Sequence, residues 1–585
     1  MKFFITSLFF FIAVNNSFPQ IIDSWQTYFE KSGYLKTPNY TETIEYFGKL
    51  DEHSEYAEMF SFGISPQGRD LNCFIASKDK AFTPEEAKTT GKPVILIING
   101  IHAGEIEGKD ASIMLLREIL ITKEKEWMLD NVILLVIPIF SVDGHERFGR
   151  YNRINQNGPE EMGWRTTARN LNLNRDWMKA DAPEMQAMLK LFSEWLPDFL
   201  VDNHTTNGAD YQYTITFGIE YFKNSYSETE TMLKNEFTPF LHEKIKEAGY
   251  LSYPYVGLRN WRAGLDSGIT EYPTSPRLSN GYAAIQNRPA LLIETHMLKP
   301  YKDRVFSTKA AMEAVIQFCG ENKEKLMELN NSADVNSVKN LLIEKKKLPV
   351  QFKLSDKSVK VPFKGVGYYK MKSEISGNEK IVYTDEKVDM EVALFNDPQI
   401  IKEASPVPRM YIIPREWSLI VERMKLHGIV IDTLKVDKTF DVKRYRFTDV
   451  KFEAASYEGR QNVSFTINEY YEKIKIPSGS FLVNTNQRTI KVITHLLEPE
   501  SNDSFMKWGF FNPVLEQKEY FEPYVMEKIA EEMIKENPAL LKDFEEKISE
   551  DEKFRNDSNA RLNFFYERSP YYDSQLNVYP VMRVE

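Results

Sequence analysis

The segment "VILIINGIHAGEIEG" (residues 94–108) joins an apolar run, typical of a buried strand, to residue types that bind metals. His102 and Glu105 lie three residues apart just after the apolar run. Nearby glycines allow the backbone to turn tightly around them. A plain turn would be enough to end a strand, so an imidazole and a carboxylate at this position indicate chemistry. Their partners must come from other parts of the chain.

Two more polar side chains stand at the ends of predicted strands. His204 directly follows "DFLVDN" (198–203), and Glu294 lies at the end of "ALLIET" (290–295). In an open α/β sheet, ligands bind in the crevice at the carboxyl ends of the strands. We therefore expect these two side chains and the pair described above to meet at one edge of the sheet.

Two imidazoles and one carboxylate, with a fourth position open to water, form a hydrolytic zinc site. The chain has only two cysteines, so a zinc site built on thiolates is excluded. Zinc lowers the pKa of its bound water to about 7, which makes hydroxide available at neutral pH. A second carboxylate must then accept the proton of the water and pass it to the leaving group.

The motifs "HAGE", "DNHTT" and "LLIETH", in this order and each after a predicted strand, resemble those of the M14, or carboxypeptidase A-like, zinc peptidases. The likeness covers roughly residues 40–320. It implies that one Zn²⁺ is bound by His102, Glu105 and His204. It also implies that Glu294 is the catalytic general base.

The same resemblance assigns substrate contacts within "GWRTTARNLNLNRDW" (163–177). Asn174 and Arg175 match the family's pair that binds the terminal carboxylate of the substrate, for which a planar guanidinium is suited by its two parallel hydrogen bonds. Arg165 matches the arginine that polarises the scissile carbonyl and stabilises its developing oxyanion. Arg169 is the weaker match for that role.

The loop before Glu294 offers two candidates for a mobile substrate-contacting tyrosine of the family. They are Tyr272 in "TEYPTSP" and Tyr282 in "NGYAAI", of which Tyr282 is preferred. His145 and His296 are further histidines near these motifs, but a site with one metal ion requires neither of them.

The elements that must position these residues follow an α/β pattern from residue 90 to about 320. Apolar strand-like runs alternate with amphipathic helical stretches: strands at 93–99, 132–138, 198–203 and 290–295, and helices at 109–120, 182–196, 230–249 and 308–329. This alternation predicts an α/β fold with a mixed, mostly parallel sheet flanked by helices. A zinc carboxypeptidase-like fold is what the resemblance implies.

The chain divides into three predicted regions. Residues 1–20, "MKFFITSLFFFIAVNNSFPQ", combine a lysine with a short apolar run, as a secretory signal peptide does. Residues 21–330 form the M14-like domain, and "NNSADVNS" (330–337) is interpreted as a linker. Along residues 331–585, apolar and polar side chains alternate at period two, and a helical pattern follows. This predicts a β-rich accessory region with a terminal helical segment.

The net charge of the chain excludes some classes of binding partner. The net charge is -11 at pH 7, which argues against a nucleic-acid or anionic-membrane binder. After signal cleavage no segment is long and apolar enough to span a membrane, so we expect a secreted or periplasmic protein.

The resulting hypothesis is a zinc metallocarboxypeptidase that acts on peptides with a free C-terminal carboxylate. Two alternatives stay open: a zinc amidase acting on peptidoglycan stem peptides or N-acyl amino acids, and a catalytically silent binding protein.

Overall fold

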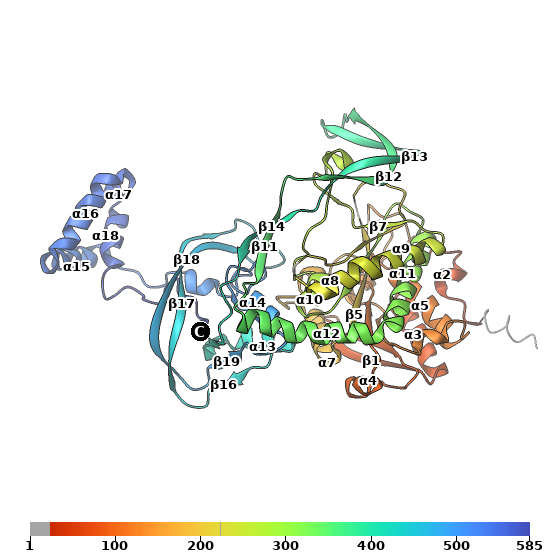
Figure 1. Cartoon of the computed structure of the whole chain (residues 1–585). Helices are drawn as coiled ribbons and strands as arrows, with labels where there is room; N and C mark the ends of the chain where they lie inside the picture. The colour runs from red at the N-terminus through yellow and green to blue at the C-terminus, as the bar shows by residue number, and fades with distance from the viewer. Residues whose placement is uncertain (1–23, 207, 223) are drawn as a thin grey trace, which may run out of the picture. The chain divides into compact units, whose positions relative to one another are not determined.

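A computed structural model describes residues 24–206, 208–222 and 224–585 of the chain (Figure 1). The predicted signal peptide therefore lies outside the described residues. The main sheet has eight strands in the order β1-β2-β4-β3-β5-β10-β6-β7. Its strands are β1 (Ala57–Ile64), β2 (Asp70–Ala76), β3 (Val94–Ile98), β4 (Ile133–Ile137), β5 (Phe199–Thr206), β6 (Ile215–Gly218), β7 (Ser252–Pro254) and β10 (Ala290–His296).

The centre of this sheet is parallel. Strands β4, β3, β5 and β10 run in the same direction, whereas β1, β2 and β6 join through antiparallel pairs. All four strands predicted for this region are present, close to their predicted bounds. The predicted fold class, a mixed sheet flanked by helices and followed by a β-rich region with terminal helices, is confirmed.

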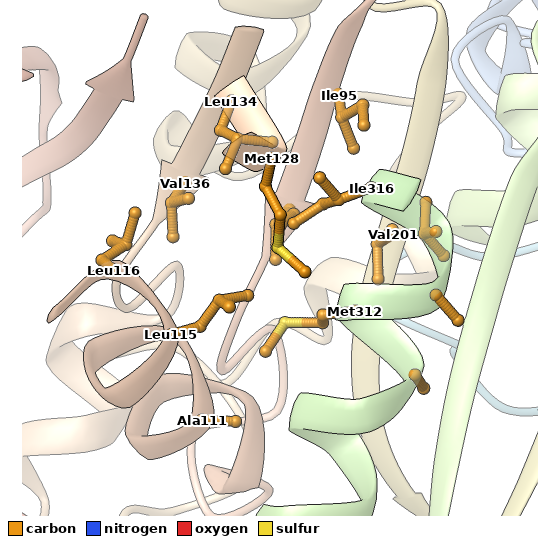
Figure 2. Close-up of a cluster of buried hydrophobic side chains, with 14 of the residues drawn as sticks. Ile95, Ala111, Leu115, Leu116, Met128, Leu134, Val136, Val201, Met312 and Ile316 are labelled. Carbon is orange, nitrogen blue, oxygen red and sulfur yellow. The ribbon is translucent and has the colours of Figure 1, made fainter. Parts of the chain in front are cut away.

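Helices pack on the sheet through a continuous apolar core. The helices of this core are α3 (Tyr40–His53), α5 (Glu107–Leu120), α9 (Thr238–Glu247) and α11 (Tyr301–Glu321). Two further helices, α7 (Pro183–Trp195) and α10 (Ser279–Ile285), contact β1, β5 and β10 outside this core. Alternate residues of the strands, such as Ile95 and Val136, face apolar side chains of α5 and α11, among them Leu115 and Met312 (Figure 2). Burial of this surface holds the strand ends in place, since each fully buried aliphatic side chain contributes about 1.5–3 kcal/mol.

The segment interpreted as a linker is helical. Residues 330–337 lie inside α12 (Lys323–Val338), and Asn330 and Ser337 are buried there. The Asn330 amide donates to Asp198, and the Ser337 hydroxyl donates to the Asn287 side chain. The linker prediction was wrong because these polar residues are bonded inside the fold instead of being solvated.

A second sheet is assembled partly from residues beyond 330. Its order is β12-β13-β9-β8, with β8 at Gly257–Leu258, β9 at Ile269–Thr270, β12 at Val359–Lys372 and β13 at Glu379–Phe395. The long β12–β13 hairpin thus pairs through β13 with β9, which in turn pairs with β8, and both short strands precede Glu294 in the chain. A two-stranded sheet, β11 (Pro349–Leu354) with β14 (Pro398–Glu403), flanks the hairpin in sequence.

Contacts divide the chain into two compact units. The first comprises the described residues up to Arg409 with Ser418–Asp432 and Val483–Ser504, and the second comprises Met410–Trp417, Thr433–Leu482 and Phe505–Glu585. The predicted boundary near residue 330 does not coincide with this division, because α12 and the β12–β13 hairpin pack with the main sheet region.

The second unit contains most of the predicted β-rich region and its helical end. Within its sheet, β15 (Met410–Ile413), β20 (Met582–Val584), β17 (Lys438–Phe452) and β18 (Val463–Ile476) are neighbours in that order. The terminal helices are α15 (Pro523–Glu536), α16 (Pro538–Glu550), α17 (Glu552–Asn556) and α18 (Ser558–Tyr566). Among the described residues, no helix has both the length and the apolar character needed to cross a bilayer.

Candidate active site

Register in the parallel sheet places two of the predicted residues side by side. His204 on β5 is paired with Glu294 on β10. Because side chains alternate between the faces of a strand, Asp202 and Thr206 lie on the same face of β5 as His204. The strand periodicity therefore builds a row of polar side chains on one face of β5, next to Glu294.

A tight turn after β3 brings His102 and Glu105 to this face. The Glu105 backbone N–H donates to the His102 carbonyl at 2.9 Å, which closes the turn just before α5. At position 108, in the first turn of α5, only glycine fits without a clash, because a Cβ there would lie 2.3 Å from Asn99 Oδ1 and 2.5 Å from Asn203 Cβ. The glycine lets α5 approach β5 closely, and so brings the two ligand-bearing segments together.

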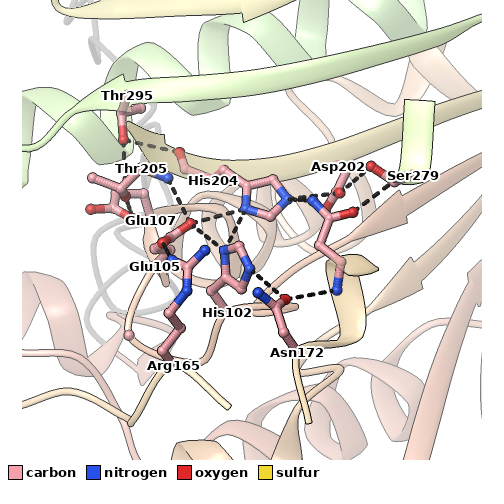
Figure 3. A network of polar contacts seen from close by, with 12 residues as sticks. His102, Glu105, Glu107, Arg165, Asn172, Asp202, His204, Thr205, Ser279 and Thr295 are labelled. Atoms are coloured by element: carbon pink, nitrogen blue, oxygen red, sulfur yellow. Dashed lines mark hydrogen bonds and ion pairs between the residues drawn. The ribbon is translucent and has the colours of Figure 1, made fainter. Parts of the chain in front are cut away.

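The side chains of His102, Glu105 and His204, here called the His–Glu–His set, converge (Figure 3). The two Nδ1 atoms are 3.2 Å apart, and Glu105 Oε2 lies 3.1 Å from Nδ1 of His102 and 2.9 Å from Nδ1 of His204. All three residues are buried. Within the described part of the chain, no other group of three or more His, Cys, Asp or Glu residues is placed to bind a metal ion.

The far nitrogens of both imidazoles are held by acceptors. His102 Nε2 lies 3.0 Å from Asn172 Oδ1, and His204 Nε2 lies 2.7 Å from Asp202 Oδ2. A hydrogen on each Nε2 leaves the Nδ1 lone pair free for a metal, and such outer contacts orient metal-binding histidines. Asn172 and Asp202 were not among the residues predicted for the site. The period of two in "DNH" could have identified Asp202, which lies on the same face of the strand as His204.

The set fits a divalent ion. Tetrahedral zinc at about 2.0–2.1 Å from each ligand atom requires those atoms to be about 3.3 Å apart, close to the separations observed here. Without an ion the same atoms form a charged cluster. Burial would lower the pKa of His204, but the Asp202 and Glu105 carboxylates raise it well above its usual value. Burial together with the His204 charge lowers the pKa of His102 to about 4, against an opposing effect of Glu105. Metal binding would release the proton from His204.

Glu105 also contacts two arginines. Its Oε1 accepts from Arg153 at 2.7 Å and from Arg165 at 3.2 Å. Burial would raise the pKa of Glu105, but His102 and the Arg153 guanidinium hold it well below its usual value, so the carboxylate stays ionised and able to bind a cation. Arg153 was not found from the sequence, because no local signal marks it.

Asn174 and Arg175 lie next to this cluster on the short helix Leu173–Arg175. The Asn174 amide nitrogen is 3.2 Å from His204 Nε2, and its oxygen accepts from the Ser279 backbone N–H at 3.0 Å. Arg175 donates to the Asn174 carbonyl at 2.6 Å. Both residues line the cavity described next, so the structure brings the predicted carboxylate-binding pair to the His–Glu–His set. Arg169 is exposed and does not line the cavity.

A cavity of about 410 Å³ opens at these residues. Its polar lining includes His102, Glu105, Arg153, Arg165, Asn174, Arg175, His204 and Glu294. Its remaining wall comes mainly from β6 and the segment 254–280, here called the pocket wall: Phe217, Ile219, Tyr221, Phe222, Pro254, Tyr255, Thr270, Glu271, Tyr272, Thr274, Leu278, Asn280 and others. The predicted ligand and base positions and both preferred arginines, Arg165 and Arg175, therefore border one space.

Glu294 borders the cavity beside the His–Glu–His set. Burial raises the pKa of its carboxyl to about 8, and the negative charges of Glu105 and Asp202 add to this rise while His204 opposes it. A carboxyl group with a pKa near neutrality can both accept and return a proton.

The structure places Tyr282, the preferred tyrosine, outside the cavity. It is fully buried on α10, its hydroxyl is 2.9 Å from His427 Nδ1, and Gln286 Nε2 donates to it at 2.7 Å. The substrate-contact prediction for Tyr282 is therefore corrected: a phenol packed in the core cannot reach a ligand. Tyr272, 55% exposed, lines the cavity instead. So does Tyr255, whose phenol pKa is raised by burial and by the nearby Glu294 charge.

The two histidines omitted from the predicted site lie elsewhere. His145 is buried between Lys109 and Glu146, at 3.1 and 3.0 Å. His296 contacts Asp210 at 3.3 Å and packs against the ring of Tyr211. Glu107, the second glutamate of the opening segment, accepts from the Thr205 hydroxyl and pairs with buried Arg304. These groups stabilise the frame around the cavity.

Part of the chain matches a known family. Residues 43–234 match the family model Peptidase_M14, described as zinc carboxypeptidase. This range includes the His–Glu–His set, Arg165, Asn174 and Arg175, but it ends before Glu294. The resemblance read from the sequence motifs is confirmed.

Curated relatives and solved structures extend this comparison. Carboxypeptidase 2 of Trichophyton rubrum is 22% identical over 493 residues, which cover 81% of this chain and 84% of that protein. Carboxypeptidase 2 of Trichophyton tonsurans is 22% identical over 479 residues, covering 76% and 78%. A metallo-carboxypeptidase from Burkholderia cenocepacia is 18% identical, with a TM-score of 0.36 over 48% of this chain and 68% of that one. Carboxypeptidase A from Helicoverpa armigera is 15% identical, with a TM-score of 0.34 over 51% of this chain and 73% of that one.

Proposed function

We propose that this protein is a zinc-dependent metallocarboxypeptidase. The premise is that residues 43–234 belong to the peptidase M14 family and that the chain is a metallopeptidase. Its substrates would be peptides with a free C-terminal carboxylate. The observation that carries the proposal is the convergence of the His–Glu–His set, Glu294 and Arg175 on one cavity.

Each side chain has a role in the proposed hydrolysis. A single Zn²⁺ held by the His–Glu–His set would supply a Lewis acid and acidify water. Glu294 would accept the proton of the attacking water and pass it to the leaving amine. Arg165 would stabilise negative charge on the carbonyl oxygen. Because Arg153 already pairs closely with Glu105, Arg165 can turn from Glu105 toward the substrate.

Arg175 distinguishes removal of a terminal residue from cleavage of an internal amide. Its guanidinium and the Asn174 amide would bind the terminal carboxylate through charge-assisted hydrogen bonds, worth about 1.5–3 kcal/mol. We expect Arg175→Ala to raise KM by about 10- to 100-fold for peptides with a free terminus. Amidated peptides serve as the comparison. An unchanged KM would favour an amidase that cuts internal bonds, such as those of peptidoglycan stem peptides.

The proposal is tested by digestion of a peptide library, read by mass spectrometry with and without a chelator. We expect stepwise loss of C-terminal residues, abolition by the chelator and recovery when zinc is returned. Internal cleavage products would contradict the carboxypeptidase assignment. A purified protein that binds no zinc and cleaves no peptide would indicate the catalytically silent alternative.

Export is a separate part of the proposal. Residues 1–20 would be removed as a signal peptide, and the mature protein would be secreted or periplasmic. N-terminal sequencing of the protein recovered outside the cytoplasm should begin near residue 21. A mature chain that still starts at Met1 would contradict it.

A further inference from the structure

Glu271 is an acidic side chain of the cavity that the proposed hydrolysis does not use. It directly follows β9 and lines the cavity together with Glu105 and Glu294. In the part of the chain that the structure describes, its carboxylate makes no hydrogen bond and no ion pair; Lys234 acts on it only at longer range. A partly buried carboxylate without a counter-ion is costly, so its place in a ligand cavity calls for an explanation.

The position of this carboxylate is well defined. The Glu271 backbone N–H donates to the Phe395 carbonyl at 3.0 Å, which ties it to the end of β13. Its charge adds to the rise that burial causes in the pKa of Tyr221, to about 12, so the carboxylate lies near that cavity-lining phenol.

A second acceptor lies in the same wall. Asn280 is 2% exposed and lines the cavity, and its amide nitrogen donates to the Thr274 hydroxyl at 3.2 Å. Its amide oxygen has no hydrogen-bond donor among the described residues. Leaving a buried acceptor unsatisfied costs about 1–3 kcal/mol, but this oxygen is closed to solvent in the structure, so it is not counted among the groups that meet a ligand.

The rest of the wall is apolar. Side chains that line it include Phe217, Ile219, Phe222, Leu278 and Leu292. Lysine and arginine bury their aliphatic stems on such surfaces while their charged ends reach polar partners. An apolar wall that carries a carboxylate without a counter-ion therefore matches a long cationic side chain better than a purely aliphatic one.

We propose that this cavity selects substrates whose released residue is lysine or arginine, with Glu271 as the counter-ion. This inference rests on the proposed carboxypeptidase function, since Asn174 and Arg175, which would hold the terminal carboxylate, line the same cavity.

The test uses the full-length, zinc-loaded protein and four N-blocked dipeptides, benzoyl-glycine joined to arginine, lysine, citrulline or leucine. Citrulline has the shape of arginine without its charge. We expect wild type to prefer arginine over citrulline in kcat/KM by about 10- to 100-fold, the worth of one charge-assisted hydrogen bond. Glu271→Gln should remove that preference and leave the leucine substrate within about threefold. Glu243→Gln, an exposed residue outside the cavity, controls for overall charge and should keep it.

Other results would overturn the inference. Equal kcat/KM for arginine and citrulline in wild type contradicts it, and so does an unchanged preference in Glu271→Gln. Equal losses on all four substrates in that variant would show a structural role only. Titration calorimetry adds a readout independent of turnover. Free arginine should bind wild type more tightly than citrulline does, whereas Glu271→Gln should bind arginine no more tightly than citrulline. A preference seen only with unblocked peptides would assign Glu271 to the amino terminus instead. Hydrolysis of none of the four substrates would contradict the proposed function itself.

Discussion

The His–Glu–His set and the pocket wall border the same cavity but are held in place by different means. The set stands on neighbouring parallel strands and on the turn before α5, and buried side chains, including Asn172 and Asp202, fix its imidazoles. The wall consists of short strands and loops. It is attached to the main sheet through β7 and to the β12–β13 hairpin through β9. One region is built by the core of the sheet, whereas the other is supported by a hairpin from a distant part of the chain.

This difference separates the two functions of an active site. The chemistry needs a fixed geometry, which the sheet provides because its central strands are buried in the helix-packed core. Recognition of a side chain needs a wall that can change without disturbing the metal ligands. Substitutions in the set should therefore affect all substrates alike, whereas substitutions in the wall should act through KM and substrate preference.

The largest effect is expected for Glu294→Gln. A glutamine cannot take up the proton of the attacking water, so kcat should fall by about 10²- to 10⁴-fold on every substrate, with zinc content unchanged. Zinc analysis together with steady-state kinetics checks this. Full activity on every hydrolysed substrate would show that Glu294 is not the base. Glu294 would then not count among the catalytic groups that the sheet holds in a fixed geometry.

Asp202→Asn should act next most strongly, through the metal. Asp202 orients His204 and raises its basicity, and loss of such contacts typically weakens metal binding by 10- to 100-fold. Competition with a chelator measures the zinc affinity, and excess zinc should restore most of the activity. If affinity for zinc stayed at the wild-type value, the strand would position His204 without help from this contact.

Phe363→Ala tests whether the hairpin supports the wall. Phe363 is buried at the base of the hairpin, where its ring packs against Tyr213 and Tyr253 at 5.3 Å, next to wall residues 254–255. We expect a stability loss of about 3–5 kcal/mol together with a raised KM and unchanged zinc content. Leu115→Ala, in the core of α5, is the matched control: it should lose similar stability and keep KM. A KM that moved equally in both variants would argue against a specific role of the hairpin.

Glu220→Gln should have the smallest effect on activity, and its main effect should be on the pH dependence of stability. Burial raises the pKa of Glu220 to about 8, although hydrogen bonds from the Thr274 and Phe222 backbone N–H groups act to lower it. These hydrogen bonds tie the wall to the segment that follows β6. The folded chain thus keeps a proton that the unfolded chain releases above about pH 4.5. This stabilisation is complete below pH 4.5 and is lost as the pH rises toward 8, by at most about 1.4 kcal/mol per pH unit.

The unfolding midpoints of wild type and Glu220→Gln, compared from pH 5 to 8, measure this loss. Wild type should lose stability relative to the variant as the pH rises. Parallel curves for the two proteins would show that Glu220 ionises at its ordinary pKa.

Much of this protein follows from local information in its sequence. The apolar runs predicted the central strands, because a strand buried on both faces is apolar throughout. The residues at their ends predicted which side chains gather, because parallel strands bring their carboxyl ends to one edge. His102, Glu105, His204 and Glu294 could thus be placed at one cavity without any knowledge of distant contacts.

Tertiary structure alone decided the remaining features. Whether Tyr272 or Tyr282 faces the cavity depends on how α10 packs, and Tyr282 lies among Trp177, Gln286 and His427. Residues 330–337 are helical because their polar groups find buried partners. The pairing of β13 with β9 joins segments more than a hundred residues apart. Side-chain chemistry and periodicity are local properties of a sequence, whereas orientation and burial result from packing of the whole chain.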